Sequence, residues 1–253
     1  MAGGSRQSSY RRGSWVQGRL WLRLASIILL LLAAGIPGAR AQTTQPALPE
    51  ADAPALPLPV AKLGDFDVMK QRRLIRILVP FSRTIYFLDK GAERGTAAEF
   101  GRQFEVWLNK KYKTKALKIR IAFIPTPRDR LLTDLNAGLG DIVAANLTIT
   151  PERLQIVDFS TPGLRGVKEV VVTGPAAPAL ASLDDLAGRE IHVRKSSSYW
   201  THLEALNAQF TAKGLKEITL RPADEDLEDE DLLEMVNAGL LPFVVVDDHK
   251  AEF

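Results

Sequence analysis

Apolar runs alternate with amphipathic segments along the chain from about residue 65 onward. Leu74–Val79 and residues 142–147 are short and nearly continuously apolar, which is typical of strands buried on both faces. Between them, residues 95–111 and 130–136 have the spacing of helices, and residues 117–124 alternate as a strand does. This order predicts βαβ units with a mostly parallel sheet that helices cover on both faces.

The helix predicted for residues 95–111 carries large side chains at helical spacing. Phe100, Phe104, Trp107 and Leu108 fall on one side of it. A stripe of this kind usually faces the core. We therefore expect these side chains in the core and not at a ligand.

The same alternation begins again after Pro162. The pattern predicts strands at residues 168–173, 190–193, 218–221 and 243–246, and helices at residues 199–212 and 231–237. Two α/β units in series, joined by one extended crossing near residues 166–172, predict two lobes that close over a ligand. We place lobe 1 at residues 65–166 and lobe 2 at residues 167–253.

The segment between the two units holds the first candidate for binding chemistry. Thr150 and Pro151 predict a helix start, with Thr at the cap and Pro at the first helical position. Arg153 then places a cation where the helix dipole is already positive, which is locally unfavourable. An arginine at this position is explained if its side chain turns away from its own helix to hold an anion, with Thr148 beside it at the carboxyl end of a strand. The alternative is a surface ion pair between Arg153 and Glu152 or Asp158.

Lobe 2 offers two further polar positions at strand ends. Residues 195–198 form a hydroxyl-rich turn between a strand and a helix, which could hold an anion or could simply cap the helix. Asp247 follows a Val-Val-Val run, where an acid would suit a ligand ammonium group but is also common in turns. Tyr86 falls after the first strand of lobe 1, near the expected ligand edge.

Residues 146–153, Asn-Leu-Thr-Ile-Thr-Pro-Glu-Arg, followed by Asp-Phe-Ser-Thr-Pro at 158–162, resemble the carboxylate-gripping segment of family 3 periplasmic solute-binding proteins. The resemblance implies an α/β, two-lobed, type II periplasmic binding protein fold. It also implies that Thr148 and Arg153 grip a ligand carboxylate and that Asp247 takes its ammonium group. Tyr86 would provide an apolar wall. The implied ligand-binding set is completed by Asn146, which opens the segment, and by Ser197 on the opposite lobe.

Residues 227–240 and 244–249 add a narrower likeness. They are similar to the solute-binding half of murein lytic transglycosylase F type proteins, in which that half precedes a lysozyme-like catalytic domain. The likeness covers roughly residues 74–253. A complete domain of this kind continues through another helix and crosses back to lobe 1, so we expect an incomplete second lobe, a looser hinge, reduced stability and weakened binding.

The start of the chain predicts export. Basic residues precede an apolar stretch at residues 24–34, and Ala39-Arg40-Ala41 follows, which is the layout of a cleavable signal peptide over residues 1–41. A stretch of eleven residues falls short of the ~20 apolar residues that span a bilayer. Residues 42–64 are rich in Pro and Ala and predict an extended linker.

The charge and the cysteine content bear on nucleic-acid binding and on the cellular compartment. The predicted leader holds six of the 33 basic residues and none of the 30 acidic ones, so 27 basic residues remain against 30 acidic and the mature chain is mildly acidic. The precursor pI of about 9.1 therefore gives no support to nucleic-acid binding. An exported chain with no Cys indicates a periplasm and a core that needs no disulfides.

Motifs for catalysis, metals and cofactors do not stand out. The three histidines, His192, His202 and His249, are scattered without paired spacing, and the serines of residues 196–198 lack the flanking glycines of a nucleophile elbow. We expect no metal, no cofactor and no enzymatic activity.

Three functions remain open. The first is a periplasmic binding domain for an amino-acid-like or small peptide-like solute, serving transport or sensing, with an inner-membrane transporter or cell-wall machinery as partner. The second is the muropeptide-sensing regulatory module of a cell-wall lytic transglycosylase without its catalytic domain. The third is a remnant that binds no ligand.

Overall fold

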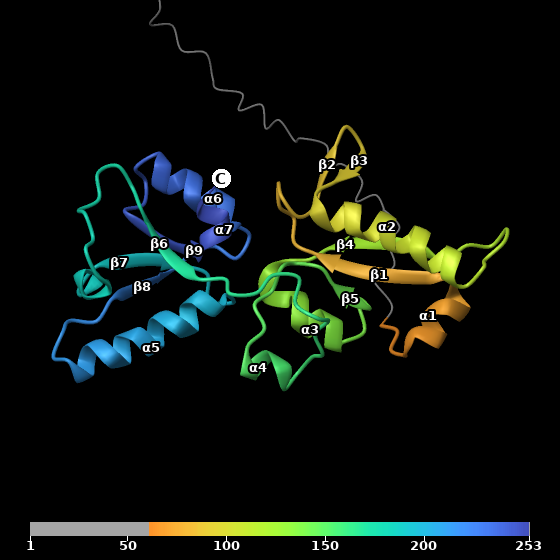
Figure 1. Cartoon of the computed structure of the whole chain (residues 1–253), viewed down its shortest axis with the longest axis horizontal. Coiled ribbons are helices and arrows are strands. Elements are labelled where there is room, and N and C mark those ends of the chain that lie inside the picture. The colour runs from red at the N-terminus through yellow and green to blue at the C-terminus, as the bar shows by residue number, and fades with distance from the viewer. Residues whose placement is uncertain (1–60, 253) are drawn as a thin grey trace, which may run out of the picture. The chain divides into compact units, whose positions relative to one another are not determined.

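The computed structural model describes residues 61–252 of the chain (Figure 1). The predicted signal peptide, and the predicted linker as far as residue 60, lie outside the described residues. Two groups of elements, each with its own sheets and helices, make up the described part. We call the group around β1, β4 and β5 lobe 1, and the group around β6 to β9 lobe 2. The exact boundary of 166/167 stays a prediction.

The sheet of lobe 1 is parallel and is centred on β1 (Leu74–Val79). Its order is β4-β1-β5, with β4 at Arg120–Pro125 and β5 at Ile142–Val143. Ile77 on β1 is in register with Phe123 on one side and Ile142 on the other. The βαβ topology predicted from the sequence is therefore present in this lobe.

The near-continuous apolar run of β1 follows from burial on both faces of the sheet. Ile75, Ile77 and Val79 pack in the cluster formed with α2 (Thr96–Lys111). Leu78 points to the opposite face and packs with Leu131 at the start of α3 (Leu131–Asn136). Each of these four β1 side chains is at most 1% exposed, so both faces are closed.

Smaller elements complete lobe 1. They are α1 (Phe66–Arg72), the antiparallel pair β2 (Phe87–Asp89) and β3 (Ala92–Arg94), η1 (Arg128–Arg130) and α4 (Pro151–Leu154). Of these, η1 and α4 matter most, because they carry the arginines discussed below.

Lobe 2 contains two strand pairs. The first, β6 (Glu169–Thr173) with β9 (Phe243–Asp247), is antiparallel, and the second, β7 (Glu190–Val193) with β8 (Thr219–Pro222), is parallel. The helical elements are η2 (Leu183–Leu186), α5 (Ser198–Ala212), α6 (Asp229–Asn237) and α7 (Asp248–Ala251).

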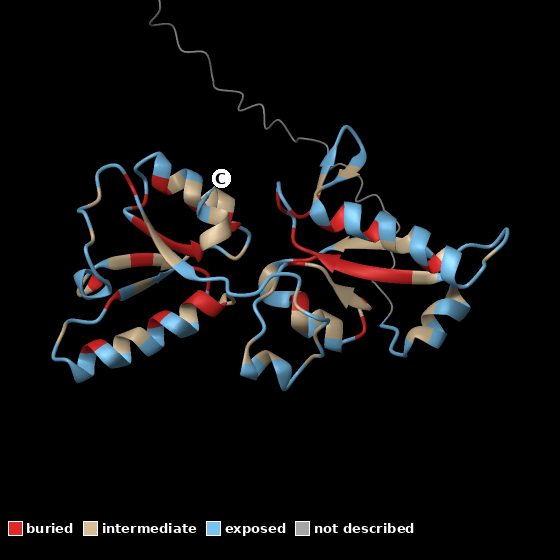
Figure 2. Ribbon diagram, viewed as in Figure 1, coloured by how far each residue is buried: buried red, intermediate tan, exposed pale blue. Residues whose placement is uncertain are grey.

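Strand β9 is the buried spine of lobe 2 (Figure 2). Phe243 and Val245 pack in the cluster that includes α5, and Val244 and Val246 pack with α6. Alternate side chains thus face two different helices, as the period of two in a strand requires. Asp247, at the end of β9, is carried directly to the edge of this core.

Two predicted strands are shorter than the sequence suggested. The strand predicted for residues 117–124 begins only at Arg120, and Leu117 is 65% exposed. The strand predicted for residues 142–147 ends at Val143. Its partner β1 ends at Val79, just beyond the last paired residue Leu78, and Asn146 adopts a left-handed conformation with φ of 50°. The polar segment 146–153 therefore begins earlier than predicted.

The core face predicted for α2 is correct for Leu108, which is buried, and in part for Phe104, which packs partly buried against the core, but it is wrong for Phe100 and Trp107. Phe100 and Trp107 are about half exposed (50% and 51%), and the aromatic rings stack along the helix, with centroids 5.6 Å apart for Phe100 and Phe104. The buried face includes the small residues Ala97, Ala98 and Gly101. A Cβ on Gly101 would lie 2.3 Å from Phe123 Cζ, so helix and sheet approach too closely for a large side chain. Close packing by small residues thus takes the place expected of Phe100 and Trp107.

Among residues 61–252, no helix is long and apolar enough to cross a membrane.

Asp141, directly before β5, hydrogen-bonds to Arg72 at the end of α1 and to Arg76 in β1. Its carboxylate accepts hydrogen bonds from the backbone N–H of Arg76 (2.7 Å) and from the side chains of Arg76 and Arg72. The Asp141 side chain is 2% exposed. Burial opposes its ionisation, but the hydrogen bonds from Arg76 and Arg72 outweigh this and hold the pKa of Asp141 below its usual value.

We expect Asp141→Asn to lower the free energy of unfolding by about 3–5 kcal/mol, because two arginines lose their buried carboxylate. Since the folded-state pKa lies below the unfolded value of about 3.9, this contribution is complete above that pH and is lost as the pH falls. Urea denaturation at neutral and acidic pH measures both effects. The control Asp67→Asn breaks an exposed pair with Lys70 and should leave stability unchanged. Equal stability of both variants at neutral pH would contradict the assignment.

Candidate functional site

A cavity of about 250 Å³ lies between the two lobes. Lobe 1 lines it with residues of η1 and α3 and of the segment 146–156. Lobe 2 lines it with residues 194 and 196–199 and with Asp229, Asp247 and Lys250. We call it the interlobe cavity. Its position beyond the carboxyl ends of β5, β7 and β9 is where α/β sheets usually bind ligands.

Arg153 reaches into this cavity from α4. Thr150 caps the helix, its hydroxyl accepting a hydrogen bond from the backbone N–H of Arg153 at 3.3 Å. The guanidinium donates to the carbonyl oxygen of Thr148 through Nη1 (2.8 Å) and to that of Ser196 through Nη2 (3.0 Å). It therefore touches both lobes. Neither Glu152 nor Asp158, nor any other carboxylate among residues 61–252, forms an ion pair with it.

The surroundings of Arg153 favour an anion. Burial and then the nearby charge of Arg128 lower the pKa of the Arg153 guanidinium. Both effects mean that the cation has lost water and gained a like charge, and the charge of Glu152, which raises the pKa, offsets them only in part. A ligand carboxylate would supply that compensation with charge-assisted hydrogen bonds.

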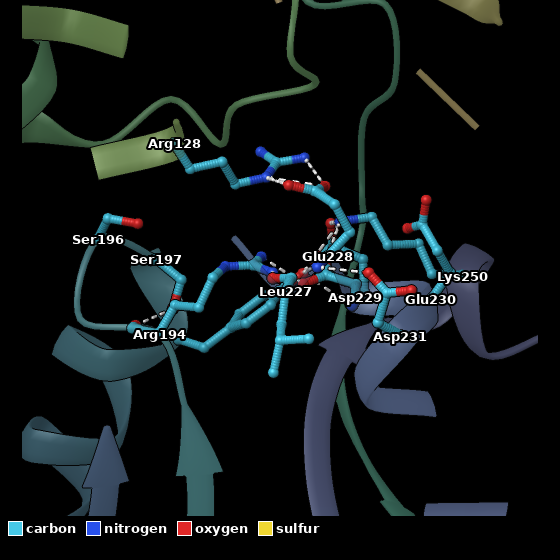
Figure 3. A network of polar contacts seen from close by, with 12 residues as sticks. Arg128, Arg194, Ser196, Ser197, Leu227, Glu228, Asp229, Glu230, Asp231 and Lys250 are labelled. Atoms are coloured by element: carbon cyan, nitrogen blue, oxygen red, sulfur yellow. Dashed lines mark hydrogen bonds and ion pairs between the residues drawn. The ribbon is translucent and has the colours of Figure 1, made fainter. Parts of the chain in front are cut away.

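Arg128 and Glu228 join the lobes by a buried, bidentate ion pair (Figure 3). Arg128 Nε lies 2.7 Å from Glu228 Oε1, and Arg128 Nη2 lies 2.7 Å from Glu228 Oε2. The two side chains are 10% and 4% exposed. An acidic run such as 228–231 is usually a solvated helix face, but Glu228 and Asp229 are buried here.

The partly buried Glu230 and Asp231 of the same run, and the exposed Glu234 beyond it, make further contacts with lobe 1. The hydroxyl of Ser82 donates to Glu230 Oε1 at 2.6 Å, and Arg83 pairs with Asp231 (2.9 Å) and Glu234 (2.8 Å). The Arg83 side chain is mostly exposed, so its pairs add little compared with the buried one.

In lobe 2, one ammonium group fills the acidic side of the cavity. Lys250 Nζ lies 2.6 Å from Asp229 Oδ2, 3.2 Å from Asp247 Oδ2 and 3.3 Å from the hydroxyl oxygen of Tyr199. Asp229 also pairs with the buried Arg194. Burial opposes ionisation of Asp229, but Arg194 and Lys250 outweigh it and lower its pKa.

The serine turn of lobe 2 also has internal partners. The backbone N–H of Ser196 donates to Glu225 Oε1 at 3.1 Å, and its hydroxyl donates to the same carboxylate. Ser197 caps α5: its hydroxyl accepts from the N–H of Trp200 and donates to the carbonyl oxygen of Arg194 at 2.8 Å. The turn thus holds an anion and caps a helix at once, but the anion is the chain's own Glu225.

Five of the six residues predicted for the site lie together. Asn146, Thr148, Arg153, Ser197 and Asp247 all line the interlobe cavity.

Tyr86 does not join them. It is 4% exposed in the core of lobe 1, packs against Phe123 at 5.2 Å between ring centroids, and donates to Glu93 Oε1 at 3.1 Å. Its place after β1 correctly suggested the edge of the sheet, but the side chain turns toward β3 and not toward the cavity.

Sequence reasoning missed Arg128, Arg194, Asp229 and Lys250 as members of the cavity. Arg194 could have been found, because it follows the apolar strand β7 as Asp247 follows β9. The partners of Arg128 and Lys250 depend on how the lobes and α7 pack, for which the sequence contains no local signal.

Comparison with known families matches residues 88–242 to the bacterial extracellular solute-binding proteins, family 3, which is more than half of the chain. The chain belongs to this family. The family 3 resemblance seen at residues 146–162 is therefore confirmed.

Two curated relatives of this family 3 chain are membrane-bound lytic murein transglycosylases F. The protein of Desulfosudis oleivorans is 30% identical over 141 residues, and that of Ectopseudomonas mendocina is 30% identical over 178 residues. These matches cover 55% and 70% of this chain but only 29% and 33% of the relatives. The family 3 chain thus spans about a third of their length, and the predicted likeness to the solute-binding part of such proteins is confirmed.

The fold of the family 3 chain also matches solved binding proteins. An ancestral arginine-binding protein bound to arginine superposes with a TM-score of 0.52 at 24% identity, covering 71% of this chain and 72% of that one. The expected two-lobed type II periplasmic binding protein fold is confirmed at this level.

We expect Glu228→Gln to part the lobes, because Arg128 loses its buried carboxylate and can regain water only if the cavity opens. The free energy of unfolding should fall by less than about 3 kcal/mol, since opening relieves most of the cost. The chain has no native cysteine, so dyes at Gln103→Cys and Ala212→Cys can report the distance between the lobes by energy transfer. The matched control Arg83→Ala, which removes only exposed pairs, should leave that distance unchanged. An unchanged distance in Glu228→Gln would contradict the role of this pair.

Proposed function

We propose that this chain is the binding domain of an exported solute-binding protein that captures a small carboxylate-bearing solute in the interlobe cavity. It acts by binding and not by catalysis. The leader predicted for residues 1–41 would deliver it to the periplasm, where an inner-membrane transporter or cell-wall machinery would be its partner.

The observation that carries this proposal is that no carboxylate among residues 61–252 forms an ion pair with Arg153, whose guanidinium donates to carbonyl oxygens instead. Each of the other cations lining the cavity faces a carboxylate within the described residues: Arg128 has Glu228, Arg194 has Asp229, and Lys250 has Asp229 and Asp247. Arg153 alone in this set donates only to carbonyl oxygens. A guanidinium presents a fork of donors that matches a carboxylate, so the cavity is set up for one.

The size of the cavity and the neighbouring side chains limit the solute. A volume of about 250 Å³ is at the small end for ligand pockets, which suits a molecule of amino-acid size. Thr148 and Asn146 stand beside Arg153 at the cavity wall and supply a hydroxyl and an amide. The arginine bound by the ancestral protein shares with this solute the size of an amino acid and a carboxylate.

A second function is favoured by the curated relatives. The chain corresponds to about a third of each lytic transglycosylase F, which supports a regulatory module that senses muropeptide fragments for a cell-wall lytic enzyme. In this case the solute would be larger than an amino acid, and part of it would extend from the cavity. Muropeptides therefore belong in the same screen as amino acids and short peptides.

We expect Arg153→Ala to weaken binding of a carboxylate solute by about tenfold to a hundredfold, because a hydrogen-bonded charge pair contributes about 1.5–3 kcal/mol. A thermal-melt screen of amino acids, organic acids, short peptides and muropeptides measures this as a lost shift in Tm. The matched control Arg130→Ala removes an exposed arginine that pairs with Asp134 on α3 and should retain the shift. No shift with any member of the screen would support a remnant without a ligand. Shifts that survive Arg153→Ala unchanged would show binding that does not depend on Arg153 and would contradict its role.

A further inference from the structure

Lys250 is held inside the cavity by two hydrogen bonds, to Asp229 and Tyr199, and by an ion pair with Asp247. An ammonium group has three N–H donors, and Lys250 Nζ has three acceptors within 3.3 Å: Asp229 Oδ2, Asp247 Oδ2 and the Tyr199 hydroxyl. The side chain is 24% exposed, and the two carboxylates are 5% and 9% exposed. Figure 3 shows Lys250 beside Asp229, on the lobe 2 side of the Arg128–Glu228 pair.

This arrangement is what a ligand's primary ammonium group would require. Asp247 is the residue that the family resemblance assigns to that ammonium, and its carboxylate is already paired. Its backbone N–H donates to the Tyr199 hydroxyl at 3.1 Å, which fixes the third acceptor in place. The site is therefore a complete ammonium receptor that the chain itself occupies.

The local charge count opposes a second ammonium. Arg194 and Lys250 already balance Asp229 and Asp247, all of them largely removed from water. A ligand ammonium would place a third cation against two carboxylates in a partly desolvated pocket, and an uncompensated buried charge is strongly unfavourable. It would have to displace Lys250 to bind.

We propose that Lys250 takes the place of the ligand's α-ammonium group, so that the interlobe cavity selects small carboxylates that carry no free α-ammonium. N-acylated amino acids, 2-hydroxy acids and dicarboxylates belong to this class. The proposal rests on the proposed function, since Arg153 holds the carboxylate, and it makes Lys250 a specificity-determining residue at the other side of the cavity.

Matched ligand sets test the selectivity. L-alanine, N-acetyl-L-alanine and L-lactate share one carboxylate and differ at the α position. L-glutamate, N-acetyl-L-glutamate and glutarate share two carboxylates and also differ at the α position. Titration calorimetry with the wild-type chain should show the acylated, hydroxy or deaminated member binding about tenfold or more tightly than the free amino acid.

Lys250→Met should reverse this order by freeing Asp229 and Asp247 for the ligand ammonium. The matched control Lys213→Met removes a lysine of lobe 2 that pairs with Asp184 at the surface, and it should keep the wild-type order. Tighter binding of the free amino acids by the wild-type chain would overturn the proposal while leaving the proposed function intact. So would an unchanged order in Lys250→Met.

A second experiment tests the ammonium receptor without a carboxylate ligand. In Lys250→Ala, ethylammonium chloride should raise Tm saturably by entering the vacated site, whereas equal sodium chloride or tetramethylammonium chloride, which has no N–H donor, should not. The wild-type chain and Lys213→Ala should show no such rise. Lys250→Gln, which keeps two donors, is the variant to use if Lys250→Ala does not fold, and it should bind free amino acids more tightly than the wild type does.

The two experiments separate the possible failures. If no acid of either set binds but ethylammonium rescues Lys250→Ala, the proposed function fails for these solutes and the ammonium receptor stands. If ethylammonium gives no more stabilisation than sodium chloride, the role of Lys250 is wrong, whatever the acids do.

Discussion

The buried pair of Arg128 and Glu228 is the interaction on which the cavity depends. It is bidentate, it is nearly closed to water, and its partners come from different lobes, 100 positions apart in the sequence. A buried charge pair gives little net stability but strongly penalises geometries in which one partner is left alone. It therefore specifies how η1 meets the start of α6. Arg153 lies close enough to Arg128 to feel its charge, and Asp229 follows Glu228 in the chain, so the remaining site groups are aligned by the same contact.

The charge pattern of the cavity follows from the folds of the two lobes. In lobe 1, β1 buries alternate residues against α2 and α3. Because β5 is short, the chain leaves the sheet early and forms the segment that ends in Arg153. In lobe 2, β9 likewise buries alternate residues against α5 and α6 and delivers Asp247 to the edge of the core. In each lobe, a central strand packed between two helices thus places charged groups at one end of the sheet.

Much of the fold could be predicted because its signals are local. Three of these signals depend only on neighbouring residues, and the structure contains each of them: the apolar run of β1, the Thr150–Pro151 cap, and the glycines that end α3 and α6. The core positions predicted for Phe100 and Trp107 of α2 were wrong, because the close approach at Gly101 is set by the sheet and not by the helix. In the site, the misfit of Arg153 with the helix dipole left a surface ion pair open as an alternative, and the family 3 resemblance favoured its place at the ligand edge. The burial of Glu228 was not predictable, because an acidic run has the same sequence pattern whether it meets water or another lobe.

The carboxylate of Glu225 on the Ser196 turn has a consequence for the order of events in capture. With Glu225 there, and with Lys250 on Asp247, both charged recognition elements of lobe 2 are satisfied before any solute arrives. The guanidinium that donates only to carbonyl oxygens, that of Arg153, belongs to lobe 1. A solute would then dock on lobe 1 first, and lobe 2 would add enclosure and shape afterwards, so that the first encounter and the final selectivity reside in different halves of the chain.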